Sequence, residues 1–283
     1  MVKINHLSSN LPPGRAYLPV FLNTYVTFAD VDRGLLPYPI TMDFQAPVAH
    51  VPSSHRHHNR VLSSRLAPPK VILCDLDGTL IDTMPILADL ATDVLEEMYG
   101  MERGLARDMY LTTCGLPFIQ QLEAICPGDA RNQAASDRFE AAKPARCNSA
   151  KLSLDTRMAL QEMRDHGVRI VVSSNNGTEN VHTFIKHNNF PFDLALGFGN
   201  GLAKGKAHVE LAMKHFAVAR EDLMFVGDSL HDGVIADQER LRFIGVAGTF
   251  SRERFSLKFP KHTVVDRFGD ISSLFWNLAA ANG

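Results

Sequence analysis

The chain lacks the features that mark several large protein classes. Its four cysteines, Cys74, Cys114, Cys126 and Cys147, show no C-x-x-C spacing, so we expect free thiols in a reducing compartment rather than a zinc site or a disulfide framework. No apolar run approaches the roughly 20 residues that a membrane helix needs. The first residues lack the charged start and compact apolar stretch of a secretory signal. We therefore expect a cytoplasmic protein without a membrane partner.

A strong charge of either sign is also missing. The 29 basic and 31 acidic residues give a formal net charge of -2, and no basic stripe is interleaved with aromatic residues. We therefore expect no nucleic acid partner. Hydrophobic residues make up 45% of the chain and charged residues 21%, which is typical of soluble globular proteins. The 283 residues are enough for one large or two modest domains.

Residues 1–68 differ in composition from the remainder. Prolines recur there without helical periodicity, and His55-Arg-His-His-Asn-Arg60 is a short basic tract rich in histidine. We expect an irregular, disordered N-terminal extension or a targeting segment. The alternatives are a true translation start further downstream, metal binding by the histidines, or an ordered arm.

From Val71 onward, apolar segments of strand length alternate with helical patterns. This alternation predicts an α/β fold, a Rossmann-like parallel sheet that is covered on both faces. We expect strands near 70–74, 168–173, 193–197, 223–227, 242–246 and 263–265. We expect helices near 153–166, 177–188, 206–217, 232–239 and 270–280. Ligands of such sheets bind beyond the carboxyl ends of the strands.

The strand signals vanish between about residues 84 and 150. Pro85 suits the start of a helix and Gly100 its end, with apolar residues at helical spacing between them. Further helices are expected near 104–111, 116–125 and 131–142. The sequence thus predicts an all-helical insert, 84–150, in an α/β core formed by 69–83 and 151–283.

Two carboxylates, Asp75 and Asp77, directly follow the apolar run Val71–Cys74. Side chains of a strand alternate between faces, so both carboxylates can point the same way only at a strand end or bend. Like charges this close repel unless a cation or shared proton lies between them, and a bound Mg²⁺ is the simplest compensation. Gly78 permits a tight turn next to the pair. A plain surface turn is the alternative, but it does not require the buried strand in front.

The string Asp75-Leu-Asp-Gly-Thr-Leu80 resembles the first motif of the haloacid dehalogenase superfamily, whose members are mostly phosphohydrolases. The resemblance covers roughly residues 70 to 280 and implies three further motifs in a fixed order. It also implies that the helical insert is a cap that closes over the site and contacts the leaving group.

The second motif of this family is a serine or threonine that ends another apolar strand. Residues 168–172 lead into Ser173, Ser174 and Asn175. A hydroxyl and free backbone N–H groups at a strand end suit phosphate binding, although such residues are also ordinary in loops. We favour Ser173 because it directly follows the apolar run, with Ser174 as the alternative.

The third motif is a downstream lysine at the start of a helix. Lys204 and Lys206 are both candidates, and we favour Lys206 because a helical apolar pattern follows it at once. Its implied role is a point charge that holds the nucleophile and the phosphate together. A solvated surface lysine is the alternative.

The fourth motif is an acidic pair behind a strand. The run 223–226 leads into Gly227-Asp228-Ser229-Leu-His-Asp232, which matches the family's Gly-Asp-Ser-x-x-Asp form. Asp228 is expected to supply a carboxylate to Mg²⁺, which prefers oxygen ligands. Asp232 is expected in the second shell, where it holds a water or orients Lys206. Capping of a helix by Asp228 or Ser229 is compatible with these roles.

The resemblance implies phosphoryl transfer through a covalent intermediate. Asp75 attacks phosphorus to form an aspartyl phosphate, and Asp77 protonates the leaving alcohol and then activates water. The expected Mg²⁺ ligands are the carboxylates of Asp75 and Asp228 and the backbone carbonyl of Asp77. The expected substrate-binding residues are Ser173, Ser174, Asn175, Lys206 and Gly78.

The predicted function is Mg²⁺-dependent hydrolysis of a small-molecule phosphomonoester, so the partner is a small phosphorylated metabolite. The acid at Asp77 argues for an oxygen leaving group, since dehalogenases and phosphonate-cleaving members of the family lack it. A sugar phosphomutase is the first alternative, but its cap histidine corresponds to Leu87 here. A non-catalytic phosphate-binding regulatory protein is the second.

Substrate choice is expected to depend on the helical insert. Its basic residues Arg107, Lys143 and Arg146 are candidates for contacts with an anionic substrate, with solvated surface charges as the alternative. The segment Thr112–Pro117 is expected to form a loop between two helices that faces the site.

Overall fold

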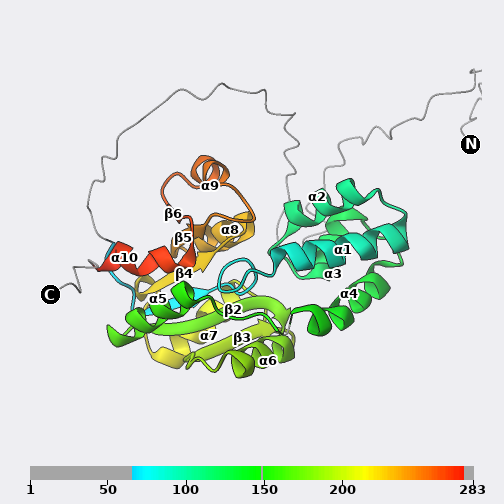
Figure 1. Ribbon diagram of the computed structural model, residues 1–283. Helices are drawn as coiled ribbons and strands as arrows, with labels where there is room; N and C mark the ends of the chain where they lie inside the picture. Colours follow the sequence, from blue (N-terminus) through cyan, green and yellow to red (C-terminus); the bar gives the residue numbers. More distant parts are fainter. Residues whose placement is uncertain (1–65, 148, 277–283) are drawn as a thin grey trace, which may run out of the picture. The chain divides into compact units, whose positions relative to one another are not determined.

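The computed structural model describes residues 66–147 and 149–276. Its centre is a six-stranded sheet in the order β3-β2-β1-β4-β5-β6, in which every neighbouring pair is parallel (Figure 1). The strands are β1 (Val71–Cys74), β2 (Arg169–Gly177), β3 (Leu194–Phe198), β4 (Leu223–Gly227), β5 (Arg242–Val246) and β6 (Thr263–Val265). All six predicted strands are confirmed, and β1 lies between β2 and β4.

Helices cover both faces of the sheet, as the alternating pattern predicts. The core clusters place α5 (Leu154–Asp165), α6 (Thr178–Asn188), η3 (Phe268–Asp270) and α10 (Ile271–Phe275) on one face. They place α7 (Lys206–Phe216), α8 (Leu230–Gln238) and α9 (Arg252–Lys258) on the other, and a short turn, η2 (Arg220–Asp222), precedes β4. The sequence patterns did not predict α9.

Strand β1 shows why its sequence is continuously apolar. Ile72 and Cys74 pack into the core cluster of one face, and Val71 and Leu73 pack into that of the other. All four are fully buried. A strand buried on both faces has no position for a polar side chain until it ends, so the first polar residues mark the edge of the sheet.

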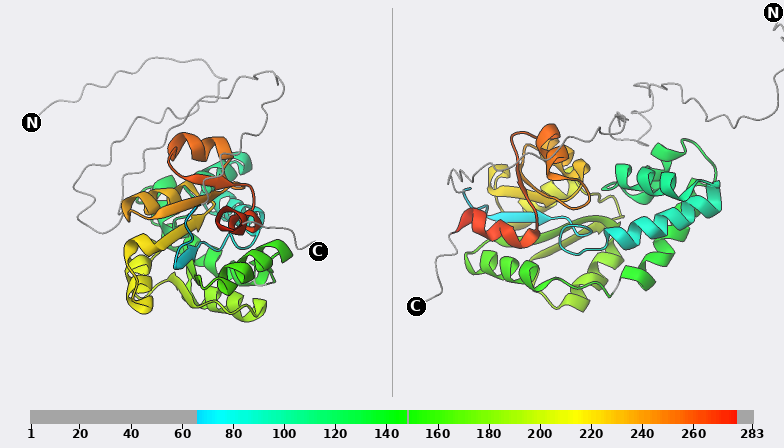
Figure 2. Two further views of the ribbon diagram at one scale, coloured as in Figure 1. Left: turned by 90° about the vertical axis from the view of Figure 1, so that its left-hand side faces the viewer. Right: turned by 45° about the horizontal axis from the view of Figure 1, so that its top comes forward.

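The described residues between β1 and α5 form four helices joined by loops and contain no strand. The helices are α1 (Met84–Tyr99), α2 (Arg103–Thr113), α3 (Phe118–Ile125) and α4 (Asn132–Cys147), which gather beside one another around a hydrophobic cluster of their own (Figure 2). Gly100 ends α1 in the left-handed conformation, with φ 68°, and its N–H donates to backbone carbonyls of the last turn. The four predicted helices are therefore confirmed.

The predicted N-terminal extension, including the histidine-rich tract 55–60, lies almost wholly outside the described residues, as does the end of the helix predicted at 270–280. Within the described ranges, no helix combines the length and the apolar character that crossing a membrane requires.

Candidate active site

The chain leaves β1 in a turn that separates three neighbouring side chains. Leu76 turns back into the core and is 2% exposed, whereas Asp75 and Asp77 both line a cavity at the edge of the sheet. The Asp77 carboxylate accepts hydrogen bonds from the Thr83 hydroxyl, at 2.5 Å, and from the side-chain amide of Asn176. The turn thus places both carboxylates on one side, as the strand-end argument predicts.

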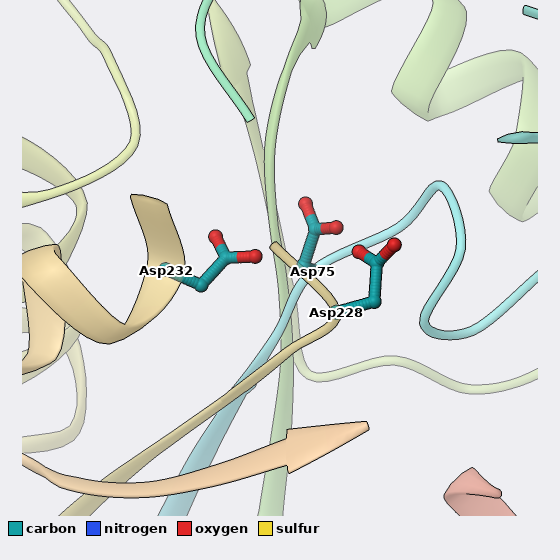
Figure 3. Close-up of side chains that lie close together, drawn as sticks. All are labelled: Asp75, Asp228 and Asp232. Atoms are coloured by element: carbon teal, nitrogen blue, oxygen red, sulfur yellow. The ribbon is translucent and has the colours of Figure 1, made fainter. Parts of the chain in front are cut away.

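Three buried carboxylates meet beside the end of β1. One oxygen each of Asp75, Asp228 and Asp232 lies within 4.8 Å of the others, and Asp75 lies between the other two (Figure 3). The Thr79 hydroxyl lies 3.2 Å from Asp228 and 3.4 Å from Asp75, and the Thr249 hydroxyl donates to Asp228. The two threonines fix the orientation of the Asp228 carboxylate, which Lys204 does not contact.

Two glycines make room for these carboxylates. Gly78 has φ 82°, and a Cβ on it would lie 2.1 Å from an oxygen of Asp228. A Cβ on Gly227 would lie 2.3 Å from an oxygen of Asp232. Any larger residue at either position would displace an acid of the cluster, so these glycines are part of the site.

The acids repel one another strongly in this environment. Burial raises the pKa of Asp75 to about 7 against the opposing effect of Lys204, and Asp232 and Asp77 raise it further. Burial, followed by the charge of Asp75, raises the pKa of Asp228 well above its ordinary value. An additional cation at this point would restore the ionised forms.

Lys204 supplies one positive charge to the cluster. Its buried Nζ lies 2.8 Å from Oδ1 of Asp75 and 2.7 Å from Oδ1 of Asp232. Burial lowers the pKa of Lys204, but the two carboxylates outweigh this effect and hold it above its ordinary value. Lys204 is therefore the charged link between the first and fourth motifs.

Lys206 does not reach the site, and our choice between the two lysines was wrong. Its side chain is 71% exposed, and the nearest acid is Glu210, at 3.8 Å along the same helix. The chain turns sharply at Gly205, with φ 116°, so the loop residue before it, Lys204, points inward, and the first helical residue after it, Lys206, points to solvent. Consequently, Asp232 orients Lys204 and not Lys206.

The two serines of the second motif point in different directions. Ser173 is fully buried, and its hydroxyl lies 2.9 Å from Nδ1 of His208, whose Nε2 lies 3.2 Å from the carbonyl of Gly197. Ser174 lines the cavity. We chose Ser173 because the apolar run ends there, but β2 continues to Gly177, so Ser173 still follows the pleat and faces α7. The structure corrects this choice in favour of Ser174.

Asn175 and Asn176 connect the site to the helical segment. The Asn175 amide donates to the carbonyl of Gly115 at 2.7 Å, and its oxygen accepts the N–H of Lys204 at 3.0 Å. Asn176 donates to Asp77 and accepts a hydrogen bond from Lys143 of α4. Asn175 was predicted to bind substrate, but both the nitrogen and the oxygen of its side-chain amide bond to protein groups.

The fourth motif also forms the start of α8. Oδ2 of Asp232 accepts from the N–H and the hydroxyl of Ser229, at 3.0 and 2.7 Å, and the Ser229 hydroxyl accepts from the N–H of Asp232. This capping box leaves Oδ1 of Asp232 for Lys204. Ser229 and Asp232 cap α8 while Asp232 also pairs with Lys204, so the predicted capping and charge-pairing roles are compatible.

The cavity has a volume of about 50 Å³ and two unlike walls. The sheet edge contributes Asp75, Asp77, Ser174, Asn175, Asn176, Lys204, Asp228 and Ser229. The helical segment contributes Met84, Leu87, Tyr110, Cys114, Gly115, Leu116, Phe118, Gln121, Phe139, Glu140 and Lys143. Of the loop predicted at 112–117, the first two residues belong to α2, and Cys114, Gly115 and Leu116 line the cavity.

The three basic residues named from the sequence separate in the structure. Lys143 is buried on the cavity wall. Arg107 and Arg146 form surface ion pairs with Asp89 and Asp93, as the solvated alternative predicted, and do not line the cavity.

Four residues that donate hydrogen bonds to the acids of the site escaped the sequence patterns: Thr79, Thr83, Asn176 and Thr249. Thr249 follows β5, the strand next to β4, so the strand-end rule that identified Asp228 was a usable signal for it. The other three lie in or beside motifs that we did identify. Their partners, however, depend on loop conformation, which the patterns do not give.

The donor set fits a hard divalent cation. Asp75 and Asp228 present buried carboxylate oxygens to one another, and Lys204 contacts only the first of them. Mg²⁺ binds through one or two carboxylates together with substrate phosphate oxygens. The pair therefore has the chemistry and the uncompensated charge that such an ion requires.

Comparison with known proteins agrees with this geometry. The family model described as haloacid dehalogenase-like hydrolase matches residues 72–246. A phosphoglycolate phosphatase of Nitrosospira multiformis is 28% identical over 182 residues, covering 60% of this chain and 79% of that protein. Another phosphoglycolate phosphatase, from Pectobacterium atrosepticum, is 26% identical over 219 residues, covering 74% of this chain and 93% of that protein.

A solved structure shares the fold. The haloacid dehalogenase-like family hydrolase of Streptococcus pneumoniae superposes with a TM-score of 0.62 at 18% identity, covering 74% of this chain and 99% of that one. The family model spans more than half of the chain and includes the residues of all four motifs. The protein therefore belongs to the haloacid dehalogenase-like hydrolases.

Proposed function

We propose that the protein is a Mg²⁺-dependent phosphatase that hydrolyses a small phosphomonoester through an aspartyl-phosphate intermediate. The observation that carries this proposal is the pairing of Asp75 with Lys204 inside a cluster of buried acids. An isolated carboxylate would be a poor nucleophile towards a phosphate dianion because both are negative. The lysine holds the carboxylate in one orientation and offsets part of the charge on the incoming phosphoryl group.

The remaining groups on the sheet edge are placed for the transfer. The Ser174 hydroxyl faces the cavity and is a donor for a phosphoryl oxygen. Asp77 is the group that gives a proton to the leaving alcohol as the P–O bond breaks. It then takes a proton from the water that attacks the aspartyl phosphate, which restores the free carboxylate of Asp75.

Thr83 and Asn176 position Asp77 for this role. Each donates to a different oxygen of the carboxylate, so its plane is fixed before substrate binds. A fixed carboxylate needs little reorganisation when the leaving group reaches it.

The residues present fit a Mg²⁺ ion. The carboxylates of Asp75 and Asp228 and the backbone carbonyl of Asp77 would hold it, and Asp232 would stay in the second shell with Lys204. When bound, the ion supplies positive charge that offsets the repulsion between carboxylate and phosphate. The raised pKa values of Asp75 and Asp228 support this assignment, because a nearby cation favours the ionised carboxylates.

We propose further that the helical segment 84–147 is a cap on the α/β core, and we call it the cap below. Its loop residue Gly115 bonds to Asn175, and Lys143 bonds to Asn176. A Cβ on Gly115 would lie 2.4 Å from the Ser229 hydroxyl, so this loop approaches the fourth motif closely. A cap in this position excludes water and limits the size of the leaving group.

A mutase is less well supported than a phosphatase. Leu87 lines the cavity and is 3% exposed. Its hydrocarbon side chain cannot move a proton to or from a sugar hydroxyl. Two relatives known as phosphoglycolate phosphatases also favour hydrolysis.

The test is phosphate release from a panel of small phosphomonoesters, with Mg²⁺ or with EDTA, by the wild type and by Asp75→Asn. We expect release that requires Mg²⁺ and is lost in the variant. Glu210→Gln, on the surface of α7, is the matched control for removal of one carboxylate. Undiminished release by Asp75→Asn would contradict the proposed nucleophile.

A further inference from the structure

Among the residues that the structure describes, those that line the cavity offer no unpaired cation to a second anion beside the phosphate. Among the described residues that line it, only Lys204 and Lys143 are cationic. Lys204 is paired with Asp75 and Asp232, and Lys143 is paired with Glu140 at 3.2 Å. The positive charge on each wall is therefore already matched by carboxylates.

This charge balance bears on the leaving group of the substrate. A carboxylate on that group would enter a small cavity next to Glu140, without a free cation to receive it. Burial of an unpaired charge is unfavourable, and the like charge of Glu140 adds repulsion. The cap wall therefore disfavours a leaving group that carries a carboxylate.

The same wall has groups that suit an uncharged alcohol. Tyr110 lines the cavity and is 3% exposed, and its hydroxyl has no hydrogen-bond partner among the described residues. Its ring packs against Phe118 and Phe139, with ring centroids 6.1 Å away in both cases. A tyrosine hydroxyl that bonds to no described protein group is free to donate to, or accept from, a hydroxyl of a ligand in the cavity. The rings of Phe118 and Phe139 can pack against the carbon atoms of the leaving group.

The pair of Lys143 and Glu140 adds a donor next to an acceptor. An ammonium group has three N–H donors, and Lys143 uses two of them, on Asn176 and Glu140. One donor is left, and the Glu140 carboxylate can accept. A hydroxyl group is both donor and acceptor, so it can bond to both members of the pair, whereas a carboxylate can only accept.

We infer that the leaving group is an uncharged alcohol with at least one further hydroxyl, held by Tyr110 and by the pair of Lys143 and Glu140. This inference rests on the proposed phosphatase function and adds the class of ester. The Asp75 carboxylate forms a bond to phosphorus as the P–O bond to the alcohol breaks, and the alcohol departs with the proton of Asp77. Water then hydrolyses the aspartyl phosphate and is the only other reactant. The names of the two curated relatives describe a substrate with a carboxylate, so the inference separates this chain from them.

The experiment compares esters that differ only in this group. The matched pairs are 2-hydroxyethyl phosphate with 2-phosphoglycolate, and glycerol phosphate with 3-phosphoglycerate. We measure kcat/KM for each with Mg²⁺, and 4-nitrophenyl phosphate reports phosphatase activity independently. We expect the hydroxyl ester of each pair to be preferred by about tenfold or more.

Glu140→Gln is the decisive variant. It removes the counter-charge of Lys143 and keeps the shape of the side chain, so we expect the preference to move towards the carboxylate esters by about tenfold. Glu97→Gln is the control, because Glu97 is a cap carboxylate that pairs with Arg138 on the surface. Glu97→Gln should leave the ratio of kcat/KM between hydroxyl and carboxylate esters unchanged.

The outcomes separate the two proposals. Turnover of 4-nitrophenyl phosphate together with equal or better turnover of the carboxylate esters would overturn the inferred substrate class and leave the phosphatase intact. If Glu140→Gln leaves the ratio of kcat/KM between hydroxyl and carboxylate esters unchanged, the inferred substrate class is likewise overturned and the phosphatase is not. Absence of turnover of every ester by the folded protein with Mg²⁺ would overturn the phosphatase, and the inferred substrate class with it.

Discussion

The two walls of the cavity are built in different ways. The sheet edge concentrates charge: Asp75 and Asp228 follow the ends of β1 and β4, and Lys204 pairs with Asp75 and with Asp232 in the first turn of α8. The cap wall is mostly aromatic and aliphatic and holds one neutralised pair of opposite charges. The difference teaches that the chemistry and the choice of substrate depend on different parts of the molecule, the sheet edge and the cap. The first needs fixed charges close to phosphorus, whereas the second needs shape and a few polar groups around the leaving alcohol.

The largest expected effect compares two lysines of the sheet wall. Lys204→Met should lower kcat by about a thousandfold, because it removes the charge that holds Asp75 and faces the phosphoryl group. Lys206→Met should stay within about twofold of the wild type, because that side chain is exposed. Steady-state kinetics on 4-nitrophenyl phosphate measure both. Equal losses in the two variants would contradict the assignment of Lys204.

Loss of Lys204 also leaves buried acids without a partner. We expect the free energy of unfolding of Lys204→Met, without Mg²⁺, to be about 3 to 5 kcal/mol lower than that of the wild type. Circular dichroism at the assay temperature therefore accompanies the kinetics, so that unfolding is not read as lost catalysis.

The second prediction concerns the proton that passes between the walls. Asp77→Asn should lower kcat by about a hundredfold for an alkyl ester such as glycerol phosphate, because the alcohol then leaves without an acid. The loss should be smaller for 4-nitrophenyl phosphate, whose leaving group is stable as an anion. A loss of equal size for both esters would mean that Asp77 does not act on the leaving group.

The third prediction distinguishes the two neighbouring serines. Ser174→Ala should reduce kcat/KM by about tenfold, since a hydrogen bond to a charged group is lost. Ser173→Ala should leave kinetics nearly unchanged but cost about 1 to 3 kcal/mol in the free energy of unfolding, because a nitrogen of His208 loses its buried partner. Urea denaturation and kinetics on both variants test this. A kinetic defect confined to Ser173→Ala would reverse the assignment.

The smallest expected effect is a change in thermal stability. Burial raises the pKa of Asp75 to about 7, so this carboxyl binds a proton in the folded protein at pH values where an unfolded aspartic acid is ionised. Between the two pKa values, the folded state without metal therefore gains stability from Asp75 as the pH falls. Above about 7 the folded protein carries the full repulsion, which Mg²⁺ would relieve.

Protons and metal thus compete for the same carboxylates. The rise in Tm on addition of Mg²⁺ should be a few degrees at about pH 8 and smaller at about pH 6. Differential scanning fluorimetry measures it, and Asp228→Asn is the variant that should lose the rise. An identical rise at both pH values, or in that variant, would argue against a metal held by these acids.

The sheet and half of the site were predictable from the sequence for one physical reason. Strands buried on both faces are continuous apolar runs, so β1 and β4 and the acids at their ends stand out. The two wrong choices, Ser173 and Lys206, arose where one residue of pleat or a glycine turn decides the direction of a side chain. Patterns of composition do not carry that information.

The cap wall was less predictable because its side chains are selected by distant contacts. Lys143 resembles the surface arginines of the same segment in sequence, and only its contact with Asn176, 33 residues away, places it in the cavity. The contact of Thr249 with Asp228 on the sheet wall is of the same kind, 21 residues apart. Such contacts depend on how the elements pack, which periodicity alone leaves open.

The central claim is that Asp75 attacks phosphorus before water does, and the stereochemical course of hydrolysis tests it most directly. A phosphorothioate ester made chiral with oxygen isotopes is hydrolysed in isotopically labelled water with Mg²⁺, and the configuration of the released thiophosphate is determined. Two successive in-line displacements, first by Asp75 and then by water, predict overall retention of configuration at phosphorus. Inversion would mean a single direct attack by water and would contradict the account.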